Sequence, residues 1–544
     1  MIKIGPVAKE EFSSREKEVE RLKKIKNDYL DGYRRNLAIL GPWSIGKTSL
    51  ILKFIHDDLG EDLFPIYLNL EEGFLKESFL GFLLHSLRRF SLVDSNFFID
   101  SAAESGRVID RDYPAFSSIV RNIELGLKNN NYELLMSSIL RLPLLIKKEF
   151  KKNSLFVIDE FFGLSKLKLN YWMQILREHI MLDEHALFIL MSSDQDRSKS
   201  VLNSELSLLF GNFEIMELDK FSYQESRGFI ESRMGKIREM NDVAIDRLIT
   251  LTAGVPLYLD ILTSWVQENV DRFDSESLIL VIRENLINNK GFLYRFFGEK
   301  LKNYPGVEKF QEFLPFIIEI ARGNTKKKSL KKLDLSYADS GYSMNGFLEK
   351  NGSFFRIKDP LFRIWLLYAY SADLMGLGIG FKARMEMLEK ELDCVNFGSN
   401  LFHSDKPMLE IEAVVKELIL KFDNEFIDLS GKRKQLPKIL SLEKESQGQN
   451  YVLFCAKREG AGHWLFLVVS PGFKEQDSYA IIERLKDSQV RFNQKIAIVP
   501  NQLEDNNVNL ILKTKGFWIW DMEFLTKLCE FYSVTGKNNV DSLA

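Results

Sequence analysis

Five short apolar runs occur within the first 220 residues of the chain, and each of them ends in polar or turn-forming residues. They span residues 36–40, 65–70, 154–160, 186–193 and 213–219. Runs of this length that are apolar on both faces are typical of buried parallel strands. Stretches with helical spacing separate them, so the pattern predicts an α/β fold, with a parallel sheet covered by helices on both sides. Residues 71–153 are expected to form a helix-rich insertion.

The pattern changes after residue 220, where the strand signal fades. Ser222 is followed three residues later by Glu225, a pairing that predicts the start of a helix. More helices are expected up to Pro305 and Gly306, which interrupt the pattern. Residues 306–372 are expected to begin with helices as well.

An extended segment is predicted at 353–357, and the polar, irregular stretch at 396–407 is typical of a linker. From residue 408 onward a helix precedes a second set of apolar runs, and a last helix follows them. These runs span residues 451–456, 465–469, 495–499 and 516–520. The pattern predicts a separate α/β domain at the C-terminus.

Composition and charge narrow the class of protein. The 544 residues are 45% hydrophobic and 28% charged, ordinary values for a globular chain with a sizeable core. A net charge of -3 argues against a chain that coats nucleic acid non-specifically, but it allows a local basic patch. The three cysteines lie far apart and the histidines are scattered. We therefore expect a reducing compartment, no structural zinc and no histidine-based nucleophile.

The N-terminus becomes charged within a few residues, which is unlike a signal peptide. The most apolar stretch, residues 364–381, contains Asp373 and several glycines. We expect a buried helix there rather than a membrane span. Both features favour a cytoplasmic protein without a membrane partner.

Residues 41–48 read G-P-W-S-I-G-K-T and fit the pattern G-x4-G-K-[ST], between a predicted strand and a predicted helix. The two glycines let backbone N–H groups wrap around phosphate, and the helix start adds a positive dipole. Lys47 is expected to reach the β- and γ-phosphates, and Thr48 to ligate magnesium. The sequence therefore predicts a site for ATP and Mg²⁺. Its predicted nucleotide-contacting residues are Gly41, Pro42, Trp43, Ser44, Ile45, Gly46, Lys47, Thr48 and Ser49.

Two acids end the third apolar run, which reads L-F-V-I-D-E. A buried strand that ends in acids is costly unless those acids have a role. Asp159 is expected to hold magnesium through water and Glu160 to orient the attacking water. The alternative is an ordinary strand end with solvated acids.

Ser192 and Ser193 end the next strand, which is expected to lie beside the P-loop. We predict that Ser192 senses the γ-phosphate, and a plain polar strand cap is the alternative. The predicted catalytic set is Glu160, Lys47 and Ser192.

Taken together, these motifs resemble the archaeal-type ATPases of the STAND class, within the AAA+-like P-loop superfamily. Residues 12–22 resemble the family's opening motif, which borders the adenine pocket; this implies a nucleotide contact by Arg15, and Ser14 stands where glycine is usual. Residues 253–259 resemble the G-x-P element of the helical lid, which implies that Pro256 packs near the adenine.

Residues 355–365 contain D-P-L-F-R-I-W and resemble the end of the family's winged-helix domain. Two departures bear on hydrolysis. Asn212 occupies the position of the family's arginine, and Met191 replaces a glycine before the first serine. An arginine in such a position is worth up to ~10³–10⁵ in rate, so slow ATP hydrolysis is expected.

The C-terminal domain resembles the restriction-endonuclease-like fold, with residues 516–525 similar to that fold's final strand and helix. The active form needs an Asp, followed on the next strand by an acid-x-Lys triplet. Here the triplet is Cys455, Ala456 and Lys457, and residues 438–442 lack the Asp. The resemblance therefore implies the fold without nuclease activity.

These expectations divide the chain into five parts. A P-loop ATPase core occupies residues 1–220 and a helical lid 221–304. A winged-helix domain follows at 305–372, a helix and linker at 373–404, and a degenerate restriction-endonuclease-like domain at 405–544.

The expected function is an ATP-driven molecular switch. The alternatives are a nucleotide-locked binding module that does not hydrolyse ATP, and an ATP-gated nuclease. Besides ATP and ADP, the candidate partners are double-stranded DNA, another protein and a second copy of the chain. DNA would meet the winged helix and its lysine run, for which a solvated loop is the alternative. That run comprises Lys326, Lys327, Lys328, Lys331 and Lys332.

Overall fold

The computed structural model divides into two compact units. The first contains Met1–Phe229 and Val255–Leu257, and the second contains Ile230–Gly254 and Tyr258–Ala544. The residues described are 15–70, 83, 86, 114–167, 172–204, 213–235, 237–302, 310–330, 348–370, 381–400, 408–429, 432–460, 462–470, 472–486, 490–499 and 507–534. Ser14, Asn212, Asp373, Lys331 and Lys332 lie outside them.

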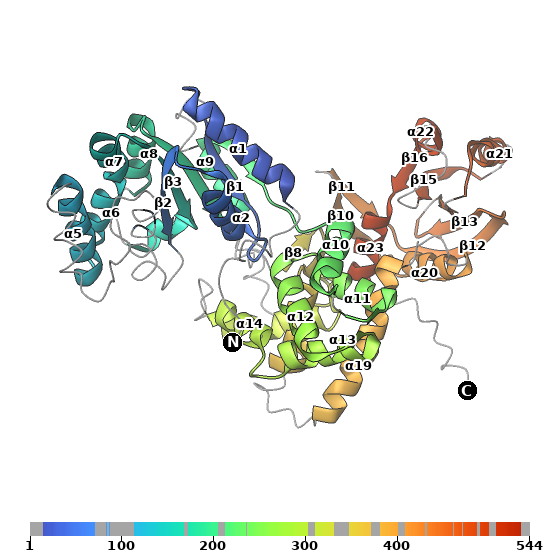
Figure 1. The fold of residues 1–544 in the computed structure, drawn as a ribbon. Helices are drawn as coiled ribbons and strands as arrows, with labels where there is room; N and C mark the ends of the chain where they lie inside the picture. The colour runs from blue at the N-terminus through green and yellow to red at the C-terminus, as the bar shows by residue number, and fades with distance from the viewer. Residues whose placement is uncertain are drawn as a thin grey trace. The chain divides into compact units, whose positions relative to one another are not determined.

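The first unit is built on a five-stranded parallel sheet (Figure 1). Its strands are β1 (Asn36–Leu40), β2 (Leu63–Asn69), β3 (Asn153–Asp159), β4 (Ala186–Ser192) and β5 (Phe213–Glu217). They lie in the order β2-β3-β4-β1-β5, and all of their pairings are parallel. This confirms the parallel sheet predicted from the five apolar runs. The order places β4 between β1 and β3, so that the ends of all three strands are neighbours.

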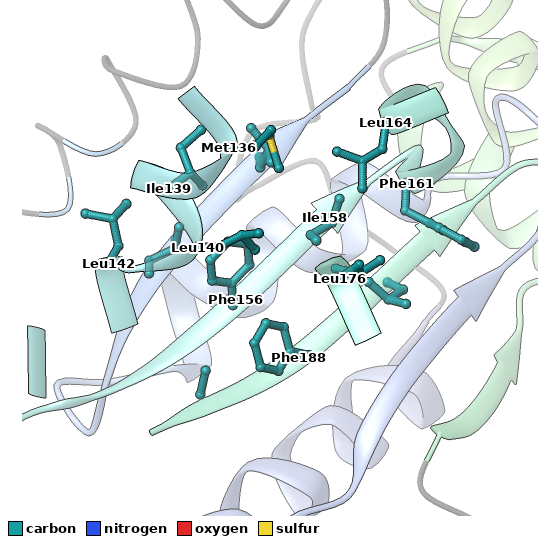
Figure 2. Close-up of a cluster of buried hydrophobic side chains, with 14 of the residues drawn as sticks. Met136, Ile139, Leu140, Leu142, Phe156, Ile158, Phe161, Leu164, Leu176 and Phe188 are labelled. Carbon is teal, nitrogen blue, oxygen red and sulfur yellow. The ribbon is translucent and has the colours of Figure 1, made fainter. Parts of the chain in front are cut away.

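Side-chain alternation splits the core of this unit into two layers, one on each face of the sheet. In β1 to β4 the buried odd-numbered side chains, such as Leu37 and Val157, pack with α1 (Glu16–Leu30) and α2 (Lys47–Lys53). The even-numbered ones, such as Phe156, pack against the other helices (Figure 2). Strands covered on both faces are apolar throughout, which explains why the five runs were recognisable in the sequence.

The helices of the second layer come mainly from the predicted helix-rich insertion. They are α5 (Pro114–Asn129), α6 (Tyr132–Leu140), α7 (Leu142–Phe150) and, after β3, α8 (Trp172–Leu182). Met136 and Ile139 of α6 and Leu176 of α8 lie over Phe156 and Phe188 of the sheet (Figure 2). Except for Leu83 and Ser86, residues 71–113 lie outside the described part of the chain.

Helices follow β5, as the sequence predicts. They are α10 (Tyr223–Arg233), α11 (Asp242–Thr252), α12 (Pro256–Asn269), α13 (Ser275–Ile282) and α14 (Phe292–Lys302). The predicted cap of α10 is confirmed, because Ser222 N donates to Glu225 Oε2 at 2.7 Å and Glu225 N donates to Ser222 Oγ at 3.2 Å. The short strands β6 (Glu239–Met240) and β7 (Arg272–Phe273) pair in parallel.

The next segment contains α15 (Phe310–Ala321), an antiparallel hairpin of β8 (Leu348–Asn351) and β9 (Phe354–Ile357), and α17 (Pro360–Trp365). The extended segment expected at 353–357 is therefore β9. The D-P-x-x-R-x-W residues have structural roles here. Asp359 caps α17 by accepting from Phe362 N at 3.0 Å, and Trp365 is 1% exposed.

Within the described residues, no helix has the length and apolar character needed to cross a membrane.

The C-terminal domain follows α19 (Phe381–Asn400) and begins with α20 (Met408–Leu420). Its sheet has the order β12-β13-β14-β15-β16; the first three strands are antiparallel and the last three are parallel. The strands are β12 (Ile439–Gln447), β13 (Tyr451–Arg458), β14 (His463–Val469), β15 (Phe492–Ile498) and β16 (Phe517–Trp520). Between and after them lie the helices α21 (Glu475–Lys486), α22 (Asn507–Thr514) and α23 (Met522–Phe531).

Two strand features of this domain differ from expectation. The hairpin of β10 (Glu425–Leu429) and β11 (Lys432–Leu436) was not predicted, and β12 extends beyond the expected 438–442. Both segments are rich in charged residues. β12 is the edge strand of its sheet and β10 and β11 form a separate two-stranded sheet, and in each of them exposed side chains alternate with buried ones or outnumber them. These strands therefore lack the apolar run that marks a buried strand.

The β8–β9 hairpin packs on the C-terminal domain within the second unit. Ser353 N donates to Phe426 O of β10 at 2.8 Å, and Phe354 stacks on Phe531 of α23 with ring centroids 5.0 Å apart. Phe354 is fully buried and belongs to the same hydrophobic cluster as the C-terminal sheet. The hairpin is therefore part of the core of the neighbouring domain.

Two residues of the lysine run take part in this contact. Lys326 Nζ lies 2.9 Å from Glu425 Oε1, on a carboxylate that is 1% exposed. Lys328 Nζ lies 3.4 Å from Asp423 Oδ2. The Lys326 ammonium group is thus paired with a buried carboxylate within the chain, which weakens the case for a phosphate contact by Lys326. The Lys328–Asp423 pair is between exposed side chains and is weak.

Candidate functional site

The loop between β1 and α2 has the backbone that the P-loop pattern requires. Gly46 has φ +93° and precedes the first residue of α2, a left-handed conformation that favours glycine. A Cβ atom on Gly41 would lie 2.6 Å from Leu218 O, so only glycine permits the close approach of β1 to the segment after β5. Both glycines are therefore explained by local geometry.

Lys47 lies at the centre of this loop and is 6% exposed. Its Nζ donates to Gly41 O at 2.8 Å and to Pro42 O at 3.0 Å. The same Nζ lies 3.7 Å from Glu160 Oε1. The ammonium group is thus directed into the loop, where a phosphate oxygen can replace the backbone carbonyls as its partner. Pro42, Trp43, Thr48 and Ser49 are partly exposed around it.

Asp159, at the end of β3, is 2% exposed and faces α2. Its Oδ2 accepts from Thr48 Oγ1 at 2.6 Å and from Tyr67 OH at 2.8 Å. A carboxylate and a hydroxyl are oxygen ligands of the kind that Mg²⁺ prefers, and Mg²⁺ is commonly held by one or two carboxylates together with substrate phosphates. The two side chains therefore fit a magnesium ion. In the described part of the chain, no group of three or more His, Cys, Asp or Glu side chains offers another metal site.

Glu160 follows directly and has the left-handed φ of +51°. Its Oε2 accepts from both Ser193 N, at 3.1 Å, and Ser193 Oγ, at 2.9 Å. Burial raises the pKa of this carboxyl group, while the positive charge of Lys47 and the Ser193 hydrogen bonds act in the opposite direction. A partly buried, oriented carboxyl group of raised pKa is suited to polarising a water molecule.

The two serines at the end of β4 lie on opposite faces of the sheet. Ser192 is fully buried on the even-numbered face, and its Oγ accepts from Asp194 N at 3.1 Å. Ser193 is the serine that contacts Glu160, whereas Ser192, the predicted γ-phosphate sensor, lies on the face of the sheet away from Lys47 and Asp159. The period of two along a strand, extended from Met191 to Ser193, could have identified the serine that faces α2.

Arg15 and Pro256, which also belong to the first unit, lie near Ser44 and Ile45 of the P-loop. Arg15 Nη2 donates to Asp219 O at 2.5 Å and to Ile45 O at 3.4 Å, and its guanidinium lies 5.0 Å from the ring centre of Phe221. Pro256 is the first residue of α12, and Leu257 N donates to Ser44 O at 3.4 Å. Both predicted residues therefore lie beside the P-loop.

The degenerate triplet of the C-terminal domain lies on β13. Cys455 is buried and pairs across the sheet with Glu443, whereas Lys457 is exposed and pairs with Ser441 and His463. Burial raises the pKa of the Cys455 thiol to about 11. A protonated thiol cannot take the part of the missing carboxylate.

The fold and the site together define the core of a P-loop NTPase: a parallel five-stranded sheet, a P-loop after β1 and paired acids at the end of β3. No protein-family model matches the chain, and no curated protein matches it. Among solved structures, a Walker-type ATPase of Pyrococcus abyssi is similar, with 15% identity, a TM-score of 0.43, and coverage of 67% of this chain and 99% of that one.

Two further solved structures are similar. The Aeropyrum pernix Orc1 protein in complex with DNA has 13% identity and a TM-score of 0.39, covering 69% of this chain and 95% of its own. The Thermotoga maritima RuvB Holliday junction branch migration motor has 15% identity and a TM-score of 0.33, covering 67% and 96%.

Proposed function

We propose that this protein binds ATP with magnesium and hydrolyses it slowly, as a nucleotide-driven molecular switch. The observation that carries the proposal is the convergence of four side chains from two parts of the chain. Lys47 and Thr48 come from the start of α2, and Asp159 and Glu160 from the end of β3 and the residue after it. Thr48 Oγ1 lies 2.6 Å from Asp159 Oδ2, and Lys47 Nζ lies 3.7 Å from Glu160 Oε1.

Each group has a separate part in the proposed reaction. The loop N–H groups and Lys47 hold the β- and γ-phosphates, and Thr48 and Asp159 hold the metal. Bound magnesium would neutralise charge on the phosphate oxygens. Glu160 orients the attacking water and accepts its proton, while Ser193 keeps the carboxylate in place. In the family that the sequence resembles, an arginine occupies the position of Asn212. The absence of its positive charge is consistent with slow ATP turnover.

The test measures ATP binding and turnover by the wild type, Lys47→Ala and Glu160→Gln. Lys47→Ala is expected to abolish binding. Glu160→Gln is expected to keep binding and to lower turnover by about 10²–10⁴-fold, the usual contribution of a positioned base. Wild-type turnover by Glu160→Gln would refute the catalytic assignment.

The proposal includes a winged-helix domain at 305–372 and a restriction-endonuclease-like domain at 405–544. The element order α20-β10-β11-β12-β13-β14-α21-β15 and the mixed sheet formed by β12 to β16 support the second of these. Because Cys455 replaces the acid of the triplet, we propose a partner-binding role rather than nuclease activity. The partner would be double-stranded DNA or a protein. Magnesium-dependent plasmid cleavage that is lost in Lys457→Ala would refute this.

A nucleotide-locked module remains the second candidate, favoured by Asn212. Two measurements distinguish the switch from the nucleotide-locked module: the identity of the nucleotide that the purified protein carries, and the rate of ATP turnover with and without double-stranded DNA. Intact bound ATP without turnover in either sample would favour the locked module. Turnover that DNA raises and Glu160→Gln abolishes would favour a DNA-coupled switch.

A further inference from the structure

One buried hydroxyl group in the site has no part in the roles described so far. Tyr67 of β2 is 7% exposed, and its hydroxyl donates to Asp159 Oδ2 at 2.8 Å. The same oxygen accepts from Thr48 Oγ1 at 2.6 Å. A tyrosine hydroxyl, whose usual pKa is about 10, is protonated at physiological pH and can act as this donor.

The parallel register explains how Tyr67 reaches this position. Tyr67 pairs with Val157 and Asn69 pairs with Asp159. Tyr67 and Val157 belong to the same hydrophobic layer beneath α2, and Asp159, two residues further along β3, faces the same side. Tyr67 and Asp159 are therefore diagonal neighbours on the same face of the sheet. The tyrosine hydroxyl reaches the carboxylate while the ring remains in the hydrophobic layer.

We propose that Tyr67 is a positioning residue for magnesium: its hydroxyl fixes the carboxylate of Asp159 in the orientation that holds the ion. The inference rests on the proposed function. Thr48 is itself a predicted metal ligand: a lone pair of its hydroxyl oxygen would bind the ion, and its O–H could still donate to Asp159. Tyr67 is not a metal ligand in this scheme and continues to hold the carboxylate. Donors that orient a ligating group typically contribute 10–100-fold in metal affinity.

The chain offers a matched control for the loss of a buried tyrosine hydroxyl. Tyr29 of α1 belongs to the same hydrophobic layer and is 5% exposed. Its hydroxyl donates to Glu184 O at 3.0 Å, a backbone carbonyl near the start of β4. Because the strands are parallel, the start of β4 lies at the edge of the sheet opposite the P-loop. Tyr29→Phe therefore removes a comparable hydrogen bond without touching Asp159.

The experiment titrates Mg²⁺ into wild type, Tyr67→Phe and Tyr29→Phe in the presence of a fluorescent ATP analogue, and it measures nucleotide affinity in EDTA separately. We expect Tyr67→Phe to need about tenfold more Mg²⁺ for half-maximal effect. Its affinity in EDTA should equal that of the wild type, because the loop and Lys47 are unchanged. Tyr29→Phe should match the wild type in both measurements, and melting temperatures show whether each variant is folded.

The possible results distinguish the positioning role of Tyr67 from the proposed ATPase function. A wild-type Mg²⁺ response in Tyr67→Phe would overturn the positioning role, as would an equal shift in Tyr29→Phe. Both results would leave the proposed function intact. Absence of any Mg²⁺-dependent nucleotide binding by the wild type would overturn the proposed function, and the positioning role with it.

Discussion

The contact between the β8–β9 hairpin and β10 predicts a specific cost for Gly352→Ala. Gly352 lies in the hairpin turn with φ +57°, and a Cβ atom there would be 2.1 Å from Phe426 O and 2.6 Å from Phe426 C. Both are backbone atoms, so they cannot move away as a flexible side-chain end would. The substitution is therefore expected to separate the hairpin from the C-terminal domain.

The magnitude has two parts. A left-handed backbone costs an alanine about 1–2 kcal/mol, and overpacking typically costs about 1–3 kcal/mol more. Gly516→Ala in the same domain isolates the first part, because Gly516 has φ +82° and, among the described residues, nothing within 4 Å of an added Cβ. The difference of about 1–3 kcal/mol corresponds to an opening equilibrium roughly 5–150-fold larger in Gly352→Ala.

Hydrogen–deuterium exchange measures this opening directly. The relevant peptides cover residues 348–357 and 425–436, which contain Ser353 N–H and the strands on both sides of the contact. Exchange in both peptides should be faster in Gly352→Ala than in Gly516→Ala by the factor given above. Equal exchange in the two variants would show that the hairpin is not held against β10, and would refute the reasoning.

Three further predictions concern single side chains. Ser193→Ala should lower the ATP turnover rate about tenfold, because it removes one hydrogen bond to the charged Glu160. Ser192→Ala should leave the turnover rate unchanged. Equal effects of the two substitutions in steady-state assays would contradict the assignment of the two serines to opposite faces of the sheet. Because the folded-state pKa of Glu160 is raised, its ionisation disfavours the folded state, and the wild type loses stability as pH rises through that pKa. Glu160→Gln should therefore gain thermal stability relative to the wild type as the pH rises above the usual range of a glutamate carboxyl group, and a difference that does not change with pH would count against the burial argument. Burial raises the pKa of the Cys529 thiol to about 12, so iodoacetamide at pH 8 should label it only after unfolding, as peptide mass spectrometry would show.

The nucleotide site could be predicted from the sequence because its signals are local. A strand, a glycine-rich turn and a helix follow one another within 18 residues, and a second strand ends in two acids. The parallel sheet was predictable for the same reason, since strands buried on both faces are apolar along their whole length.

The contacts that complete the site depend on strand register, which the chain order does not show. Tyr67 reaches Asp159 only because β2 pairs with β3 in the observed register. Before that pairing is known, a tyrosine in a strand indicates nothing beyond β-propensity. Ser193 differs, because alternation along β4 distinguishes it from Ser192 once the buried face is known.

The packing of the C-terminal domain was even less accessible to prediction. Lys326 and Glu425 are 99 positions apart along the chain and form an ion pair at 2.9 Å. In the sequence, Lys326 belongs to a run of lysines that favours a solvated or phosphate-binding surface. Only the tertiary fold brings it to a buried carboxylate.

Phe354 has a practical consequence for dividing the protein into fragments. The sequence predicts a linker at 396–407, a natural position for a truncation, but residues 396–400 belong to α19 and residues 401–407 lie outside the described part of the chain. A fragment that begins there lacks Phe354, which is fully buried among the side chains of the C-terminal core and stacks on Phe531. The gap left by a missing phenylalanine typically costs about 3–5 kcal/mol. A C-terminal fragment that retains the β8–β9 hairpin, beginning ahead of residue 348, is therefore expected to be the more stable one.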